Sequence, residues 1–331
     1  MSEPPHPLSY TFEVSPRPEV YVVTPRKMRP YWLHFLLLLA TMFTTLMVGA
    51  QLYQNFQHGL PAFTLGDEVL PLFHLKWIWQ HPGRLVMGIP FSAALMTILL
   101  AHELGHFLLC ERYGVNATLP FFIPAPTLIG TMGAFIRIKS PIRSRRALFD
   151  IGVAGPIAGF VVALPVLLLG LALSKPLAPV MGTESLDVGY PLIFQIAHRL
   201  VTSAGAPAIG LRQLALHPIA VAAWVGMLAT ALNLLPGGQL DGGHIVYAVA
   251  PRAHKWVTIV TVAMLALLSV LWMGWLVWAL ILGVTGWRHP PVAPWPELGE
   301  GRQGLSLVAV ALLVLTWVPA PVLGQGWLLG K

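Results

Sequence analysis

The stretch ILLAHELGHFLL, residues 98–109, places two histidines and a glutamate in a long apolar run. An ionisable side chain at membrane depth costs roughly 3 kcal/mol or more, so it usually faces a protein interior or a water-filled cavity. His102 and His106 are four residues apart. On a helix, both imidazoles would therefore lie on one face, within reach of one metal ion. Glu103 would lie beside that ion without binding it, as in the His-Glu-x-x-His zinc signature, where the glutamate is the general base.

This motif alone leaves an alternative open. A pair of buried histidines could also be hydrogen-bonded within a helix bundle, with Glu103 as their partner, as in a proton-coupled transporter. A catalytic zinc site further needs a third protein ligand and a free position for water. The third ligand cannot come from a thiolate cluster, because Cys110 is the only cysteine.

The composition indicates an integral membrane protein. Of the 331 residues, 56% are hydrophobic and only 10% are charged, whereas about a quarter are charged in an average soluble protein. Apolar runs close to the roughly 20 residues of a membrane-spanning helix occur at 31–51, 85–110, 151–173, 218–235, 257–285 and 305–323. The run 257–285 is long for one helix, and we expect two short helices that turn near Gly274. The predicted class is an all-α polytopic membrane protein with six to seven transmembrane helices.

The basic residues predict an orientation. They are frequent in residues 1–30 and in the loop 112–146, whereas the loop after the first run holds only Lys76 and Arg84. By the positive-inside rule, the N-terminus and the loop 112–146 are cytoplasmic. This topology explains the net charge of +7 without nucleic acid. Residues 1–30 lack a signal or transit pattern, and we expect a cytoplasmic tail followed by a single transmembrane domain over 31–331.

Membrane depth points to a third metal ligand. Under this orientation the runs 85–110 and 218–235 both end toward the cytoplasm, so His102 and His106 lie near the same depth as the segment NLLPGGQLDGGHI, residues 233–245. Asp241 is the only acidic residue for many positions on either side. The prolines and glycines of this segment would break the helix and let Asp241 turn back toward the metal. His244 is a rival ligand three residues further on.

HELGH together with the later NLLP and LDG motifs resembles the site-2 protease family of intramembrane zinc metalloproteases. The similarity includes GTMGAFIRIKSPIRSRRALFDIGVAGPIAG, residues 130–159, which looks like the prokaryotic and plastid branch without a PDZ domain. The resemblance implies one Zn²⁺ per chain held by His102, His106 and Asp241. It also implies that Glu103 is the catalytic acid and base, and that Asn233 holds the scissile carbonyl or its oxyanion. The catalytic core would cover about residues 85–250.

A short segment near the middle of the chain predicts a strand. Residues 135–139 alternate as a strand does, and the prolines before them disfavour a helix. A strand edge in lipid must be covered by protein or water. We expect a small re-entrant β segment near the active site that pairs with an unwound substrate, with an interfacial loop as the alternative. The residues predicted to bind substrate are Gly130, Thr131, Met132, Gly133, Ala134 and Phe135.

The function predicted from motifs and resemblance is hydrolysis of a peptide bond in or near the transmembrane segment of single-span proteins, in regulated intramembrane proteolysis. The alternative is a metal-ion or proton-coupled transporter. The expected partners are the lipid bilayer and a single-span substrate, with no nucleic acid, and the expected location is a bacterial inner membrane with the site toward the cytoplasm. Asp150 is expected to cap the next helix, and Gly155 and Gly159 to allow close helix packing.

Overall fold

A computed structural model describes residues 31–64, 81–179, 185–206, 208–286, 289–293 and 298–323. The predicted N-terminal tail, residues 1–30, lies outside these ranges, as does Lys76. The described part is mostly helical, with two small two-stranded sheets. The predicted helical class is therefore confirmed.

Three helices are long and apolar enough to cross a membrane. They are α1 (Trp32–Gln57), α3 (Ile89–Arg112) with the 3-10 helix Pro82–Gly88 that leads into it, and α4 (Arg145–Ala172). The shorter helices are α5 (Leu192–Ser203), α6 (Pro218–Asn233), α7 (Asp241–Val249), α8 (Pro251–Leu268), α9 (Gly274–Thr285) and α10 (Glu300–Thr316). A second 3-10 turn covers Leu211–Gln213. The structure identifies this as an integral membrane protein, whereas the count of six to seven spans stays a prediction.

The run 257–285 forms two helices, as predicted, because α8 ends at Leu268 and α9 begins at Gly274. Helix α5 was missed. It lies in a connection that contains no long apolar run, and its buried residues are Ile193, Phe194 and Ala197. A short helix with one buried face gives a much weaker hydropathy signal than a membrane span.

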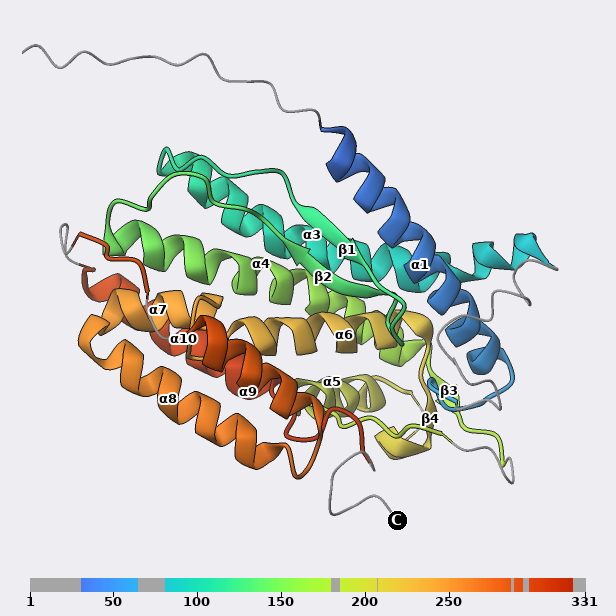
Figure 1. Cartoon of the computed structure of the whole chain (residues 1–331). Coiled ribbons are helices and arrows are strands. Elements are labelled where there is room, and N and C mark those ends of the chain that lie inside the picture. The colour runs from blue at the N-terminus through green and yellow to red at the C-terminus, as the bar shows by residue number, and fades with distance from the viewer. Residues whose placement is uncertain are drawn as a thin grey trace, which may run out of the picture. The chain divides into compact units, whose positions relative to one another are not determined.

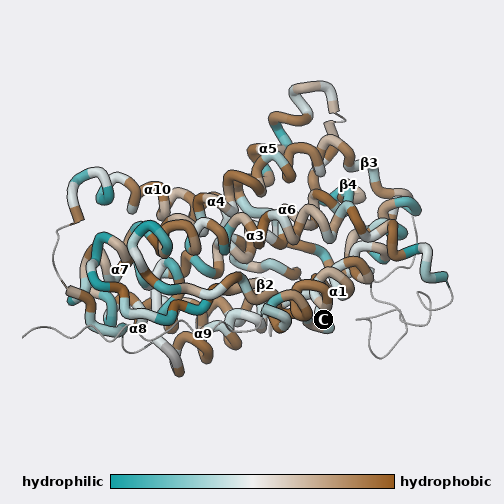
Figure 2. The backbone as a smooth tube through the Cα atoms, turned by 90° about the horizontal axis from the view of Figure 1, so that it is seen from above, coloured by the Kyte–Doolittle hydropathy of each residue, from teal (hydrophilic) through white to brown (hydrophobic). Residues whose placement is uncertain are grey.

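Helices α3, α4 and α6 form the centre of the bundle (Figure 1). Phe91, Leu95 and Ile98 of α3 are almost fully buried, and they belong to the same apolar cluster as Leu167 of α4 and Met227 of α6. Figure 2 shows mainly hydrophobic residues along α3, α4 and α6 and more hydrophilic residues where α7 and α8 meet. The apolar packing holds α3 against α4 and α6, and this arrangement places the end of α6 beside His102, within the second half of α3.

A β-hairpin follows α3. Strand β1 (Phe121–Pro124) pairs antiparallel with β2 (Thr131–Phe135), with Phe121 opposite Phe135. The hairpin packs on α1, where the Thr44 hydroxyl donates to the Gly130 carbonyl at 2.6 Å. A strand is thus present in the predicted segment, but it covers residues 131–135. Of the alternating residues 135–139 on which the prediction rested, Phe135 is the last residue of the strand and Ile138 forms an isolated bridge with Ala117. The other sheet joins β3 (Lys175–Pro176) to β4 (Leu214–Ala215).

The start of α4 differs from the prediction. Ser144 caps this helix by accepting a hydrogen bond from the Ala147 backbone N–H at 3.2 Å. Asp150 lies within the first turns of α4, and its carboxylate accepts two hydrogen bonds of 2.7 Å from Arg302 of α10. Tyr113 also donates to Asp150. The expectation that Asp150 caps the helix is wrong, because the helix begins earlier at a residue that can cap it.

Candidate metal centre and active site

Three side chains predicted as metal ligands converge between α3 and α7. The Nε2 atoms of His102 and His106 are 3.1 Å apart, and each lies 3.2 Å from Oδ2 of Asp241. Among the His, Cys, Asp and Glu side chains of the described residues, these three lie close enough together to hold a metal ion. Asp241 is 139 residues from His102 in the chain, so the fold brings these atoms together as the depth argument expected.

The spacing of the three atoms fits one metal ion. Ligand atoms about 2.0–2.1 Å from a tetrahedral zinc are about 3.3 Å apart, close to the observed 3.1–3.2 Å. The tautomer of His106 also fits. Its Nδ1 lies 2.7 Å from the Ile151 carbonyl, which can only accept, so Nδ1 carries the proton and Nε2 keeps a free lone pair. Two imidazoles and a carboxylate are a ligand set suited to zinc.

Two glycines of α4 make room for the histidine rings. A Cβ atom at Gly155 would lie 2.1 Å from Nε2 of His106, and one at Gly159 would lie 3.2 Å from Cβ and Nδ1 of His102. The sequence predicted helix packing at these glycines and no chemistry. The structure shows that α4 packs directly against the candidate ligands themselves.

Glu103 lies beside the three ligand atoms without joining them. Its side chain is buried, and its carboxylate lies near the Ile136 backbone N–H, next to the end of β2. This contact links the candidate general base to the β-hairpin. Within β2, Thr131 is buried and bonds the Ile123 carbonyl, whereas Met132 and Phe135 are exposed. The predicted substrate strand therefore lies next to Glu103 and presents side chains outward.

A buried loop places the remaining predicted residues. Asn233 is the last residue of α6, and its Nδ2 lies 3.2 Å from Nε2 of His102. Residues 234–240 then turn back, and Gly238 has a φ of +62° that favours glycine. Asp241 begins α7 immediately afterwards. The loop thus carries Asn233 at one end and Asp241 at the other.

His244, the rival third ligand, points elsewhere. Its Nδ1 lies 2.8 Å from Nε2 of His289, and it is outside the group of three ligand atoms. The ring of His289 stacks on Tyr247 at a centroid distance of 3.9 Å. Sequence reasoning did not find His289 as a neighbour of the site, although this histidine lies in RHPP, residues 288–291, a segment that weakly resembles the site-2 protease family.

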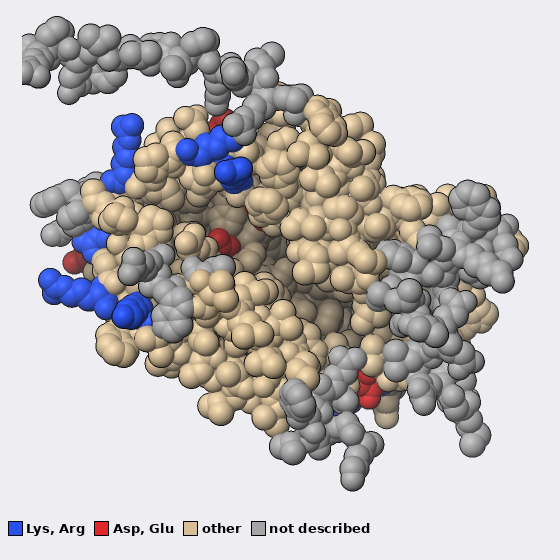
Figure 3. Space-filling view, in the orientation of Figure 1, with Lys and Arg blue, Asp and Glu red and all other residues tan. Residues whose placement is uncertain are grey.

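The face shown in Figure 3 is hollowed near its middle, and an acidic side chain is visible inside the hollow. Lys and Arg side chains gather toward the end of the molecule where α4 begins and α7 meets α8. The exposed basic residues of the described ranges near this end are Arg112, Arg137, Lys139, Arg143, Arg252 and Lys255.

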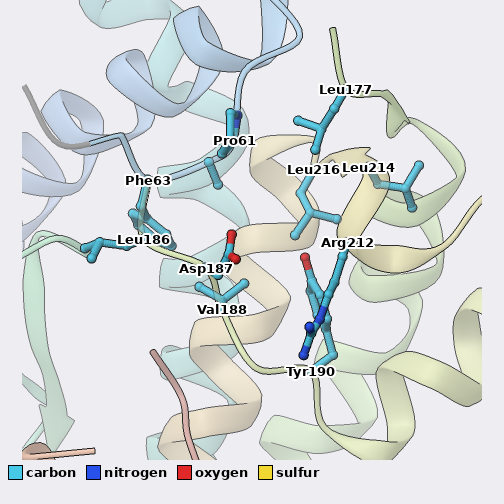
Figure 4. A pocket seen from close by; sticks show the side chains of 11 residues that line it. Pro61, Phe63, Leu177, Leu186, Asp187, Val188, Tyr190, Arg212, Leu214 and Leu216 are labelled. Atoms are coloured by element: carbon cyan, nitrogen blue, oxygen red, sulfur yellow. The ribbon is translucent and has the colours of Figure 1, made fainter. Parts of the chain in front are cut away.

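A small cavity of about 40 Å³ lies at the β3–β4 end of the molecule (Figure 4). Asp187, Tyr190 and Arg212 line it together with apolar side chains, and no predicted site residue is among its lining residues. Burial, followed by the nearby charge of Asp187, raises the pKa of Tyr190 to about 12. The phenol is therefore neutral at physiological pH, and this cavity is separate from the candidate metal centre.

The fold and the site together define a helical membrane protein with a group of two histidines and one aspartate that could hold a metal ion. Residues 90–271, more than half of the chain, match peptidase family M50. The chain belongs to this family, and the predicted site-2 protease resemblance is confirmed.

Several plant proteins are similar to this chain. "Probable zinc metalloprotease EGY1, chloroplastic" from Oryza sativa subsp. japonica is 30% identical over 92% of this chain and 53% of its own length. The Arabidopsis thaliana protein of the same name is 34% identical over 70% of this chain and 43% of its own length. "Probable zinc metalloprotease EGY2, chloroplastic" from Arabidopsis thaliana is 30% identical over 60% of this chain and 34% of its length. The chain spans about half or less of the length of these relatives.

Proposed function

We propose that this protein is an intramembrane zinc metalloprotease that cleaves single-span membrane proteins in or near their transmembrane segment. The observation that carries the proposal is the convergence of His102, His106 and Asp241 to 3.1–3.2 Å on buried helices. Membership of peptidase family M50 favours this function over the transporter that the two histidines also allowed.

One Zn²⁺ per chain, held by His102, His106 and Asp241, would supply Lewis-acid chemistry and lower the pKa of a bound water to about 7. Glu103 takes the proton of the attacking water and passes it to the leaving amine. Asn233 donates a hydrogen bond from Nδ2 to the carbonyl oxygen as negative charge develops there. Its place at the end of α6, 3.2 Å from His102, supports this role.

The substrate is proposed to bind as an extended segment along β2. A transmembrane helix has satisfied carbonyl groups, so it must unwind before attack. An unwound segment can add by main-chain hydrogen bonds to the edge of β2 that does not pair with β1, along residues 130–135. The packing of β2 on α3 supports the proposal, because it places the end of this strand, next to Ile136, beside the proposed general base Glu103. Release of a membrane-tethered regulator by such cleavage is the proposed cellular role.

The proposed orientation has the N-terminus and the active site on the cytoplasmic side of a bacterial inner membrane. It is supported by the exposed basic residues at the end where α4 begins and α7 meets α8. The short apolar helices α6 and α9 are proposed to lie within the membrane. Helix α6 covers only 16 residues, about 24 Å at 1.5 Å per residue. It stops short of a full crossing because the loop that follows delivers Asp241 at membrane depth.

The test replaces Glu103 with glutamine, which preserves the size of the side chain and removes its ability to take a proton. Glu103→Gln is expected to abolish cleavage of a model single-span substrate in detergent, while elemental analysis still finds one zinc per chain. Continued cleavage by this variant would show that Glu103 is not the general base.

The ligand assignment is tested by the pair Asp241→Ala and His244→Ala. Asp241→Ala is expected to lose the zinc and the activity, whereas His244→Ala keeps the zinc, since His244 bonds His289 instead. Zinc that survives the loss of Asp241 would move the third ligand elsewhere. A wild-type protein with neither zinc nor cleavage would contradict the proposed function as a whole.

A further inference from the structure

Helix α8 carries a buried polar stripe. The buried residues of this helix are His254, Thr258, Thr261 and Leu265, which lie at positions i, i+4, i+7 and i+11 and therefore on one face. Three of the four are polar, although the helix is otherwise mainly apolar. Buried polar groups need hydrogen-bond partners, so this face must meet polar atoms of another segment.

Those partners are main-chain atoms of the loop 234–240. The Gly238 carbonyl lies 3.0 Å from Nε2 of His254, and the Gly238 N–H donates to the Thr258 hydroxyl at 3.2 Å. The Thr261 hydroxyl donates to the Pro236 carbonyl at 3.1 Å. Because a carbonyl only accepts, Nε2 of His254 must carry the proton. The stripe of α8 thus supplies one acceptor and two donors that match the loop atom by atom.

These contacts fix the loop at Gly238. Gly238 has a positive φ of +62°, and its N–H and carbonyl are both bound by residues one helical turn apart on α8. Asp241 follows three residues later, and Asn233 precedes the loop. A change in the backbone at Gly238 would therefore shift the carboxylate that lies 3.2 Å from each histidine.

We propose that His254, Thr258 and Thr261 are positioning residues, which hold the loop so that Asp241 and Asn233 meet the two histidines in the geometry that metal binding and catalysis need. This inference rests on the proposed function, because it assigns a role toward the same metal centre. Metal sites tolerate ligand displacements of only about 0.2 Å, so loss of the loop contacts should reduce both zinc affinity and turnover.

The experiment compares Thr258→Val with Thr316→Val in the purified full-length protein. Both threonines are buried and donate to the carbonyl four residues earlier, Thr258 to His254 and Thr316 to Leu312. Only Thr258 also accepts from the loop. Zinc affinity is measured by competition with a chromogenic chelator, and kcat and KM are measured on a model single-span substrate.

Thr258→Val is expected to lower zinc affinity about 10- to 100-fold, the usual effect of losing a supporting contact around a metal site. The value of kcat should fall more than KM changes. Thr316→Val should match the wild type in both. Thr258→Ser keeps the hydroxyl and should restore zinc affinity and kcat, whereas rescue would not follow if only the volume of the side chain mattered.

Two substitutions of His254 provide a second comparison in the same experiment. His254→Gln retains an N–H that can reach the Gly238 carbonyl, so it should keep more zinc affinity than His254→Leu. Thr261→Val is the mildest change, since the Thr261 hydroxyl shares its proton between the carbonyls of Pro236 and Val257. If Thr258→Val does not yield folded protein, zinc affinity and kcat are measured on Thr261→Val instead.

The proposal is overturned if Thr258→Val, His254→Leu and Thr261→Val all bind zinc and turn over like the wild type. That outcome is distinguishable from failure of the proposed function, in which the wild type itself neither binds zinc nor cleaves.

Discussion

The substitution Gly155→Ala is expected to affect the metal site much more than the stability of the fold. A Cβ at this position would lie 2.1 Å from Nε2 of His106, whereas ordinary contact begins at 3.4 Å. The ring in Gly155→Ala must therefore move by about 1.3 Å, the difference between these two distances. A displacement of that size is several times the tolerance of about 0.2 Å for a metal ligand.

The expected loss of zinc affinity in Gly155→Ala is at least about 100-fold, or about 2.7 kcal/mol at 25 °C. The effect on folding is smaller. Overpacking costs about 1–3 kcal/mol, and the replacement of a helical glycine by alanine returns about 1 kcal/mol. The free energy of unfolding of the metal-free protein should thus fall by about 2 kcal/mol or less.

The assay measures zinc per chain by elemental analysis, zinc affinity by chelator competition, and thermal unfolding of the metal-free protein in detergent. Gly283→Ala on α9 is the control, because its added Cβ would have no heavy atom nearer than 4.0 Å. It should bind zinc like the wild type. If Gly155→Ala binds zinc with wild-type affinity, the added Cβ does not displace His106, and α3 and α4 must instead separate without disturbing the ligands.

Three further predictions concern stability. Zinc at 100 times its Kd should raise the free energy of unfolding by about 2.7 kcal/mol, and a chelator followed by thermal unfolding should remove that difference. Arg302→Leu removes both 2.7 Å hydrogen bonds to Asp150 and should destabilise the protein by about 1–3 kcal/mol; an unchanged melting temperature would contradict this. The pKa of Tyr190 is raised to about 12, so the unfolded state loses its proton first and stability should fall as pH rises from about 10 to 12. Tyr190→Phe should abolish that part of the pH dependence.

The sequence predicted the long helices and the pair of histidines well, because both depend on patterns within one segment. Asp241 was found by a different argument, since it is far away in the chain. The depth comparison succeeded because a membrane reduces the search for a partner to one coordinate. The same argument could not separate Asp241 from His244, which lies at nearly the same depth. In the structure, Oδ2 of Asp241 lies 3.2 Å from both histidines, whereas His244 bonds His289.

The contributions of α4 and α8 could not be predicted in this way. Gly155 and Gly159 have the spacing of an ordinary helix-packing motif, and nothing in that spacing says that a histidine ring occupies the gap. Asp150 was expected to act within its own helix, but its partner Arg302 is 152 residues away. These features depend on which faces of the helices meet, which hydropathy does not determine.

The break between α6 and α7 nevertheless carried a signal that sequence reasoning could have used. Non-helical backbone at membrane depth must have its N–H and carbonyl groups satisfied by other parts of the protein. A predicted break therefore requires polar side chains on a neighbouring helix. His254, Thr258 and Thr261 recur at helical spacing within an otherwise apolar run soon after the break, and each bonds the loop. A polar stripe on one apolar helix is thus best interpreted together with a break in another, because each explains how the other can exist in a membrane.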